Sequence, residues 1–284
     1  LIGGALASGA IQLDGSATIT GDIGNGGGNA NIIGANAGGT IDFQANGGTI
    51  KLTSTQNNIL VDFDLVINTD QTGVVDASSL TNAQTLTISG DIGIIGANNK
   101  TLGQFNIGSS KTALNDGDVA INELVIGNNG SVQFANNTYL ITKTTNAANQ
   151  GKIIFNPVVA NNTTLAAGTN LGSAAKPLAE INFAPAIDTI LNVGQGVNLY
   201  ATNITTAAAN MGSFSFKAGG TNIVSGIVGG QQGNKFNTVT LDNGTTAKFL
   251  GNATFNGETT IEDNSTLQIG GNYTADFVAS ADGT

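Results

Sequence analysis

Residues 239–256 read VTLDNGTTAKFLGNATFN, and residues 259–276 read TTIEDNSTLQIGGNYTAD. Laid over each other at an offset of 20 residues, from 239 to 259, the two stretches share the same alternation and the same turn positions. Residues two apart on a strand point to the same side, so the alternation predicts three short strands per repeat. The predicted inward pairs are Val239 with Thr259, Leu241 with Ile261, Ala247 with Leu267, Phe249 with Ile269, Ala253 with Tyr273, and Phe255 with Ala275.

Strands of about three residues cannot form a core by themselves, because an isolated short hairpin is only marginally stable in water. They can do so when each repeat stacks on the one before and the inward side chains form columns. We therefore predict an all-β fold, a parallel β-helix with roughly 20–25 residues per rung and loop insertions at its corners. The alternatives fit less well, since a β-sandwich needs longer strands with hairpin turns and a β-propeller needs a period near 40.

The template recurs outside the opening pair of stretches. Residues 121–140 align without a gap on residues 236–255, and ATITGDIG at 17–24 returns as LTISGDIG at 86–93. Two ranges depart from it. We expect 157–178, which contains two of the three prolines, to be a corner insertion, and 203–212 to be a loop or a single helical turn. The remaining pattern predicts one β-helical domain over residues 1–284.

The composition supports strands and tight turns. The chain has 284 residues, of which 40% are hydrophobic, with 41 Gly and 3 Pro. Its formal net charge is −10, and all nine basic residues are Lys. An acidic chain without Arg is poorly suited to nucleic acid or anionic lipid, so neither is expected as a partner. The absence of Cys and His excludes disulfides and argues against a zinc site.

No targeting or membrane-spanning segment is expected. The N-terminal stretch LIGGALASGAIQ is apolar, but it lacks the basic region of a signal peptide, since the first Lys is Lys51. No stretch approaches the roughly 18 uninterrupted apolar residues of a membrane-spanning helix. Because the chain starts and stops within the repeat pattern, we expect it to be an internal segment of a larger protein.

Two carboxylate pairs are candidates for chemistry. In VDFDLVI at 61–67, Asp62 and Asp64 share one face about 7 Å apart, a separation that glycoside hydrolases use. No cationic side chain lies nearby in sequence to hold an anionic sugar, so a solvated outer face is the alternative. In NDGDVAINE at 115–123, Asp116 and Asp118 are calcium candidates, although the ligand order of an EF-hand is missing.

No other catalytic or cofactor-binding constellation is found. A serine nucleophile would lack a histidine to activate it, and no cofactor is expected. One further acidic pair follows from the stacking. Asp242 and Glu262 are predicted to share one corner on neighbouring rungs, where they would either splay into water or bind a cation.

The final third of the chain resembles a known family. Residues 197–284, beginning VNLYATNITTAAANMGSFSF, and KPLAEINF at 176–183 are similar to the passenger regions of the rickettsial surface cell antigen autotransporters. The resemblance implies a right-handed β-helix exported by type V secretion and displayed on the outer-membrane surface of a bacterium. It covers the passenger and not the membrane-anchoring barrel of that family. It offers no motif for receptor contact, so no binding residue is assigned.

The resemblance implies a non-enzymatic adhesin segment that attaches to a host-cell surface protein. Two alternatives stay open. One is a surface-coat or spacer segment without a specific receptor, which packs against copies of itself. Self-association through open rung edges at the ends of the segment is a separate expectation. The other is a carbohydrate-active β-helix that uses Asp62 and Asp64. No membrane insertion by this segment is expected under any of the three.

Overall fold

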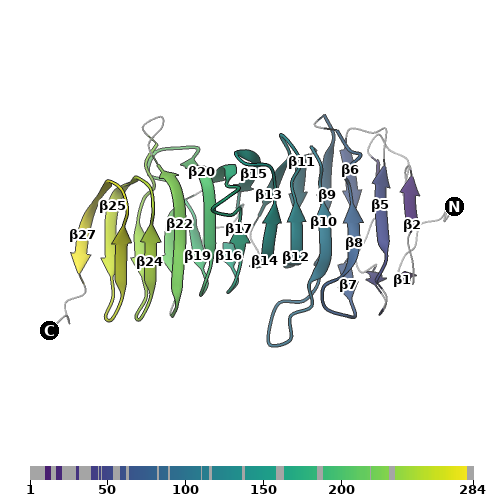
Figure 1. The fold of residues 1–284 in the computed structure, drawn as a ribbon, viewed down its shortest axis with the longest axis horizontal. Helices are drawn as coiled ribbons and strands as arrows, with labels where there is room; N and C mark the ends of the chain where they lie inside the picture. Colours follow the sequence, from purple (N-terminus) through teal and green to yellow (C-terminus); the bar gives the residue numbers. More distant parts are fainter. Residues whose placement is uncertain are drawn as a thin grey trace. The chain divides into compact units, whose positions relative to one another are not determined.

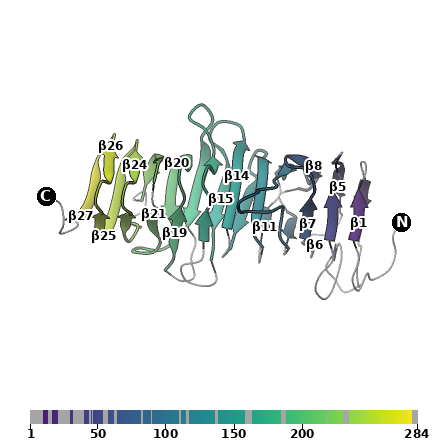
Figure 2. The same ribbon diagram turned by 90° about the horizontal axis from the view of Figure 1, so that it is seen from below.

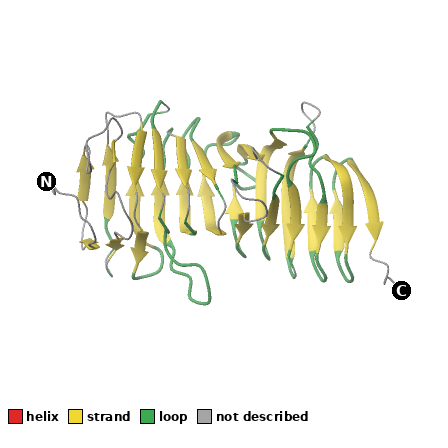
Figure 3. Cartoon of the chain, turned by 180° about the vertical axis from the view of Figure 1, so that it is seen from behind, coloured by secondary structure: helices red, strands yellow, loops and turns green. Residues whose placement is uncertain are grey.

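The fold is built from strands throughout the described residues. The computed structural model describes residues 10–13, 17–20, 30–31, 40–43, 45, 47–53, 58–61, 64–81, 83–88, 90–109, 111–114, 117–135, 138–157, 163–183, 188–217, 219–229 and 234–279. This part of the chain contains strands and turns but no helix, and hence none with the length and apolar character needed to span a membrane (Figure 3). The chain divides into two compact units. The single domain expected over residues 1–284 stays a prediction.

Unit 1 comprises Leu1–Gln133 and Leu140–Thr145 and contains three columns of parallel strands (Figure 1). The first column is β1 (Ala10–Leu13), β4 (Thr40–Phe43) and β7 (Asp64–Ile67). The second is β2 (Ala17–Thr20), β5 (Thr49–Thr53), β8 (Thr72–Asp76), β10 (Leu102–Asn106), β12 (Val119–Val125) and the end of β14 (Thr138–Thr145). The third is β3 (Ala30–Asn31), β6 (Asn58–Val61), β9 (Thr85–Ile88), β11 (Lys111–Leu114) and β13 (Ser131–Phe134).

Unit 2 comprises Phe134–Tyr139 and Asn146–Thr284 and repeats this arrangement (Figure 2). One column runs through β15 (Gln150–Phe155), β18 (Leu178–Phe183) and the second half of β20 (Asn198–Thr206). Another is β16 (Thr163–Leu165), β19 (Ile190–Val193), β21 (Ser213–Phe216), β23 (Val239–Leu241), the end of β25 (Ala253–Ile261) and β27 (Tyr273–Ala279). The third is β17 (Asn170–Leu171), the start of β20, β22 (Thr221–Val228), β24 (Thr246–Phe249) and β26 (Thr266–Ile269).

This stacking of three parallel columns confirms the predicted parallel β-helix. Five of the six inward pairs predicted at the offset of 20 are partners in the structure, from Val239 with Thr259 to Ala253 with Tyr273. The sixth, Phe255 with Ala275, is wrong, because the register shifts between Thr254 and Glu258. A local irregularity of this kind cannot be read from an alternation that continues on both sides of it.

The core of unit 2 is an aromatic column. Phe155, Phe183 and Phe214 are fully or almost fully buried, and successive ring centroids lie 5.5 and 5.2 Å apart. These distances lie in the range at which tilted and edge-to-face pairs attract. The column also includes Phe134, Tyr139, Phe216, Phe236, Phe249 and Phe255. Buried Ile, Leu and Val side chains dominate the described core of unit 1, with Phe43 and Phe105 among them.

The structure differs from the expected corner insertions. Within the range 157–178, β16 and β17 are core strands, and Leu165 and Leu171 are fully buried. Residues 203–206 belong to β20, and only 207–212 form the turn that follows. Rung length also varies more than predicted: it is 19 residues between Gln104 and Glu123, 28 between Asn170 and Asn198, and 33 between Ala17 and Ile50. In long rungs the strands are separated by more loop residues, so the repeat is harder to recognise in the sequence and short strands are mistaken for loops.

Candidate functional site

The two carboxylate candidates of the sequence meet in one column of unit 1. Asp64, Asp91 and Asp118 lie on successive rungs, 27 residues apart. The Asp91 N–H donates to Asp64 Oδ1 at 2.9 Å, and the Asp118 N–H donates to Asp91 Oδ1 at 2.7 Å. The other members of the two pairs, Asp62 and Asp116, lie outside the described residues.

The geometry makes this column a series of hydrogen-bonded links between rungs, which we call staples. Asp64 and Asp91 each direct one carboxylate oxygen at the backbone of the next rung, where a charged acceptor forms a stronger bond than a neutral one. The backbone continues the same link, since the N–H of Leu65 donates to the carbonyl of Asp91 at 2.7 Å. No group of three or more carboxylates able to hold a metal ion is present in the described part of the chain.

A hairpin follows Asp91 and projects from unit 1 between β9 and β10 (Figure 1). Ile94 and Lys100 exchange both backbone hydrogen bonds, at 2.9 and 3.0 Å. The Lys100 ammonium donates to the carbonyl of Asn68 at 2.9 Å. Ile94 is 48% exposed. The hairpin is therefore anchored at its base and presents an apolar side chain to solvent.

Asp70 fixes the other end of this hairpin. Its Oδ1 accepts hydrogen bonds from both the N–H and the hydroxyl of Thr101, each at 2.8 Å. Partial burial alone would raise the pKa of Asp70, but the hydrogen bonds from Thr101 and Gln71 outweigh it and lower the pKa below its usual value. The carboxylate is thus held ionised as a structural acceptor.

Glu123 lies at the centre of a polar cluster on the outer face of unit 1. It forms an ion pair with Lys143 at 2.8 Å. It also accepts hydrogen bonds from the Thr145 hydroxyl at 2.6 Å and from the Gln104 amide at 3.1 Å. The hydrogen bond from Lys143, followed by the one from Thr145, lowers the pKa of Glu123 to about 2. All its partners lie on neighbouring strands, so the cluster links three rungs.

Unit 2 repeats this constellation around Glu180. Lys152 pairs with its Oε2 at 2.8 Å, while the Thr205 hydroxyl and the Asn182 amide donate to Oε1 at 2.6 and 3.3 Å. Burial would raise the pKa of Glu180, but the hydrogen bond from Lys152 and those that follow lower it overall. Both clusters combine one Glu, one Lys, one Thr and one carboxamide, and their charges are compensated internally.

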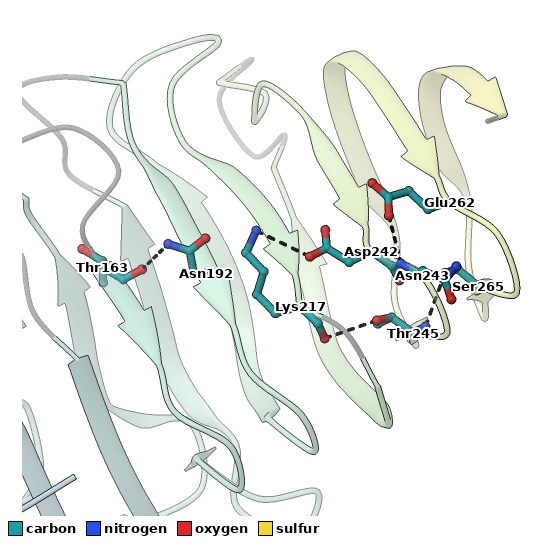
Figure 4. A network of polar contacts seen from close by, with 8 residues as sticks. All are labelled: Thr163, Asn192, Lys217, Asp242, Asn243, Thr245, Glu262 and Ser265. Atoms are coloured by element: carbon teal, nitrogen blue, oxygen red, sulfur yellow. Dashed lines mark hydrogen bonds and ion pairs between the residues drawn. The ribbon is translucent and has the colours of Figure 1, made fainter. Parts of the chain in front are cut away.

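Asp242 and Glu262 lie at one corner on neighbouring rungs, as the sequence predicts (Figure 4). Each carboxylate has a protein partner of its own. Lys217 from the preceding rung lies 3.6 Å from Asp242, and Glu262 accepts a hydrogen bond from the N–H of Asn243 at 3.0 Å. Thr245 also donates to the carbonyl of Lys217 at 3.2 Å. The corner is therefore another structural link between rungs.

Sequence reasoning missed the clusters around Glu123 and Glu180. Their members are outward-facing residues that lie side by side only in the correct register, and the rungs concerned have unequal lengths. The sequence held one signal for them. Charged or amide residues stand at the outward positions of strands whose alternate residues are buried.

Comparison with known proteins identifies the family of this chain, which the geometry alone does not. The model of the Rickettsia outer membrane protein B passenger domain matches residues 1–284. The chain is 79% identical to outer membrane protein B of Rickettsia conorii and 77% identical to that of Rickettsia rickettsii, with 100% of the chain covered in both alignments. It is 67% identical to the protein of Rickettsia prowazekii over 99% of the chain.

The chain spans 18% of the length of each of these relatives. No solved structure matches it significantly. The names of the relatives agree with the expected autotransporter class and the expected location at the bacterial surface. The chain belongs to the family of the passenger domain of rickettsial outer membrane protein B.

Proposed function

We propose that this chain is a non-enzymatic adhesive segment of the passenger, which contributes to attachment to host cells through a host surface protein. The observation that carries the proposal is family membership over the whole chain, in a protein named for the bacterial outer membrane. The fold is consistent with it, because stacked rungs bury the core and leave corner loops free to contact a partner. The Ile94 hairpin is one such loop, and the two backbone hydrogen bonds between Ile94 and Lys100 close its base.

A binding experiment on cells tests the proposal. Purified, labelled segment is added to cultured mammalian cells with and without an excess of unlabelled segment. Saturable binding that the unlabelled segment abolishes is expected. A matched pair of hairpin variants, Ile94→Ser and the buried-core control Ile92→Val, then asks whether the hairpin contributes. Binding that is absent or does not saturate would contradict an adhesive role for this segment.

A second candidate function is packing between copies in a surface coat. Two apolar side chains of unit 2 favour it, since Leu250 is 49% exposed and Ile227 is 37% exposed. Exposed apolar groups favour contacts with other proteins when they lie close enough to act together. Sedimentation velocity over a range of concentrations tests this candidate. A monomer at every concentration, unchanged by Leu250→Ser, would exclude self-association of this segment. The carbohydrate-active alternative gains no support from Asp64, whose described role is to staple two rungs.

A further inference from the structure

Asn222 is a polar residue enclosed in the core of unit 2. It lies on β22 two residues before the buried Val224, and the alternation on that strand directs both side chains inward. Asn222 is fully buried, as are Val197 on the preceding rung and Ala247 on the following rung. A carboxamide in such a place needs hydrogen-bond partners inside the protein, because a buried polar group without one is costly.

The protein satisfies only the oxygen of this carboxamide. Asn222 Oδ1 accepts a hydrogen bond from the backbone N–H of Val197 at 2.9 Å. Because a backbone N–H can only donate, this bond also fixes which end of the amide is the oxygen. The Asn222 Nδ2 group, with two N–H donors, is buried and has no hydrogen-bond partner among the described residues. Turning the amide over would lose the bond to Val197, so it does not resolve the missing contact.

The side chain next to the Asn222 amide on the following rung is small. The inward column runs from Val197 through Asn222 and Ala247 to Leu267. Ala247 has the shortest side chain of the four and is the direct partner of Asn222. A buried site of this kind can accommodate a molecule of the size of water when polar groups line it.

Thr245 brings a second buried polar group into the same corner. Thr246 pairs with Thr221, so Thr245 lies one position earlier on the rung that follows Asn222. Thr245 is fully buried, and its hydroxyl donates to the carbonyl of Lys217 at 3.2 Å (Figure 4). No group within the described part of the chain donates to this hydroxyl oxygen, which therefore keeps its capacity to accept.

We infer that Asn222 holds one internal water molecule in the core of unit 2. The Nδ2 group donates to the water oxygen, and the water donates to the hydroxyl oxygen of Thr245. Water is the ligand because the site is closed to larger molecules and because water both accepts and donates; buried waters typically make about three hydrogen bonds to otherwise unpaired groups. The carboxamide then links three rungs from the inside, Val197 directly and Thr245 through the water.

A crystal structure of the purified segment, at a resolution that orders buried waters, tests the site directly. Electron density for one water is expected about 3 Å from Asn222 Nδ2 and within hydrogen-bond distance of the Thr245 hydroxyl. A dry site, with the amide turned towards an aromatic ring or another protein group, would overturn the inference. A water that contacts Asn222 but not Thr245 would overturn the link to the third rung. The test involves no receptor, so its outcome is separate from that of the adhesion assay.

A pair of variants at Ala247 tests the same site in solution. Val and Thr have nearly the same shape, so Ala247→Val and Ala247→Thr both occupy the space of the water, but only the Thr hydroxyl can accept from Asn222 Nδ2. We expect the higher urea-unfolding midpoint for Ala247→Thr.

Ala253 provides the matched control, since it is also buried in unit 2 and pairs with Val228. A buried hydroxyl gains no such partner there, so Ala253→Val is expected to be the more stable variant. A midpoint for Ala247→Val equal to or above that of Ala247→Thr would contradict the inference. If neither Ala247 variant folds, the wild-type crystal structure decides alone.

Discussion

The Asp64 carboxylate accepts a hydrogen bond from the backbone N–H of Asp91, and the two residues occupy equivalent places on successive rungs of unit 1. Asp91 repeats the same bond to Asp118. A carboxylate that accepts a backbone hydrogen bond in this way links neighbouring rungs and stabilises the stack. Asp64, a catalytic candidate of the sequence, and Asp118, a calcium candidate, thus lie in the same column.

Replacement of Asp91 tests the staple directly. Asp91→Asn keeps an oxygen that can accept the N–H of Asp118, whereas Asp91→Ala removes it. We expect Asn to be tolerated and Ala to cost about 1 kcal/mol of unfolding free energy. Urea denaturation with and without calcium provides the measurement. A rise in the unfolding midpoint when calcium is added, lost in Asp91→Ala, would show that the column binds the ion after all.

The Glu123 cluster should make stability depend on pH in the acidic range. Its folded-state pKa of about 2 lies below the usual value of 4.5, so the ionised form stabilises the fold above 4.5 and this contribution is lost as the pH falls towards 2. Glu123→Gln is expected to cost about 1 kcal/mol at neutral pH, because the cluster is partly exposed to solvent. Thermal unfolding from neutral to acidic pH checks this: the difference between wild type and variant should shrink with acid. A difference that is constant with pH would contradict the ionised role.

The inward and outward alternation of β23 can be tested with one pair of variants. Leu241 is fully buried and Thr240 faces outward. Leu241→Asp would bury an unpaired charge and is expected to cost more than about 3 kcal/mol, whereas Thr240→Asp should cost less than about 1 kcal/mol. Circular dichroism during chemical unfolding measures both. Equal losses would mean that the register assigned to this rung is incorrect.

Substitution of two glycines of unit 2 measures two effects separately, steric contact at one and backbone strain at the other. A Cβ on Gly251 would lie 2.2 Å from the carbonyl oxygen of Gly226 on the preceding rung, so Gly251→Ala must push neighbouring rungs apart. Gly244 has a φ of 73°, but a Cβ added there would meet no atom within 4 Å, so Gly244→Ala meets strain alone. We expect losses of more than about 2 kcal/mol and of about 1 kcal/mol, respectively. Differential scanning calorimetry of the two variants decides the order, and a larger loss in Gly244→Ala would be inconsistent with close stacking at Gly251.

The sequence was most informative where rungs have equal length. The pairing of Leu241 with Ile261 and of Phe249 with Ile269 could be predicted because both pairs keep the 20-residue offset. The column of Asp64, Asp91 and Asp118 could not, because its 27-residue spacing belongs to longer rungs with a different template. Side-chain clusters such as that of Glu123 depend on a register that only the three-dimensional pairing reveals. The inward position of Asn222 follows from the alternation on β22, but its hydrogen bond to Val197 on the preceding rung does not.

The unequal rungs also bear on how such a chain changes during evolution. Each rung keeps its inward columns while its corners vary in length, as the 19- and 28-residue spacings show. An insertion at a corner therefore alters the surface and leaves the stack intact, whereas a one-residue insertion within a strand moves every following side chain of that strand to the opposite face. The alignment with the Rickettsia conorii protein runs over 308 positions against 284 residues in this chain, so the relatives differ by insertions. An insertion at a corner would therefore change the outline of the surface while the stacked scaffold stays the same.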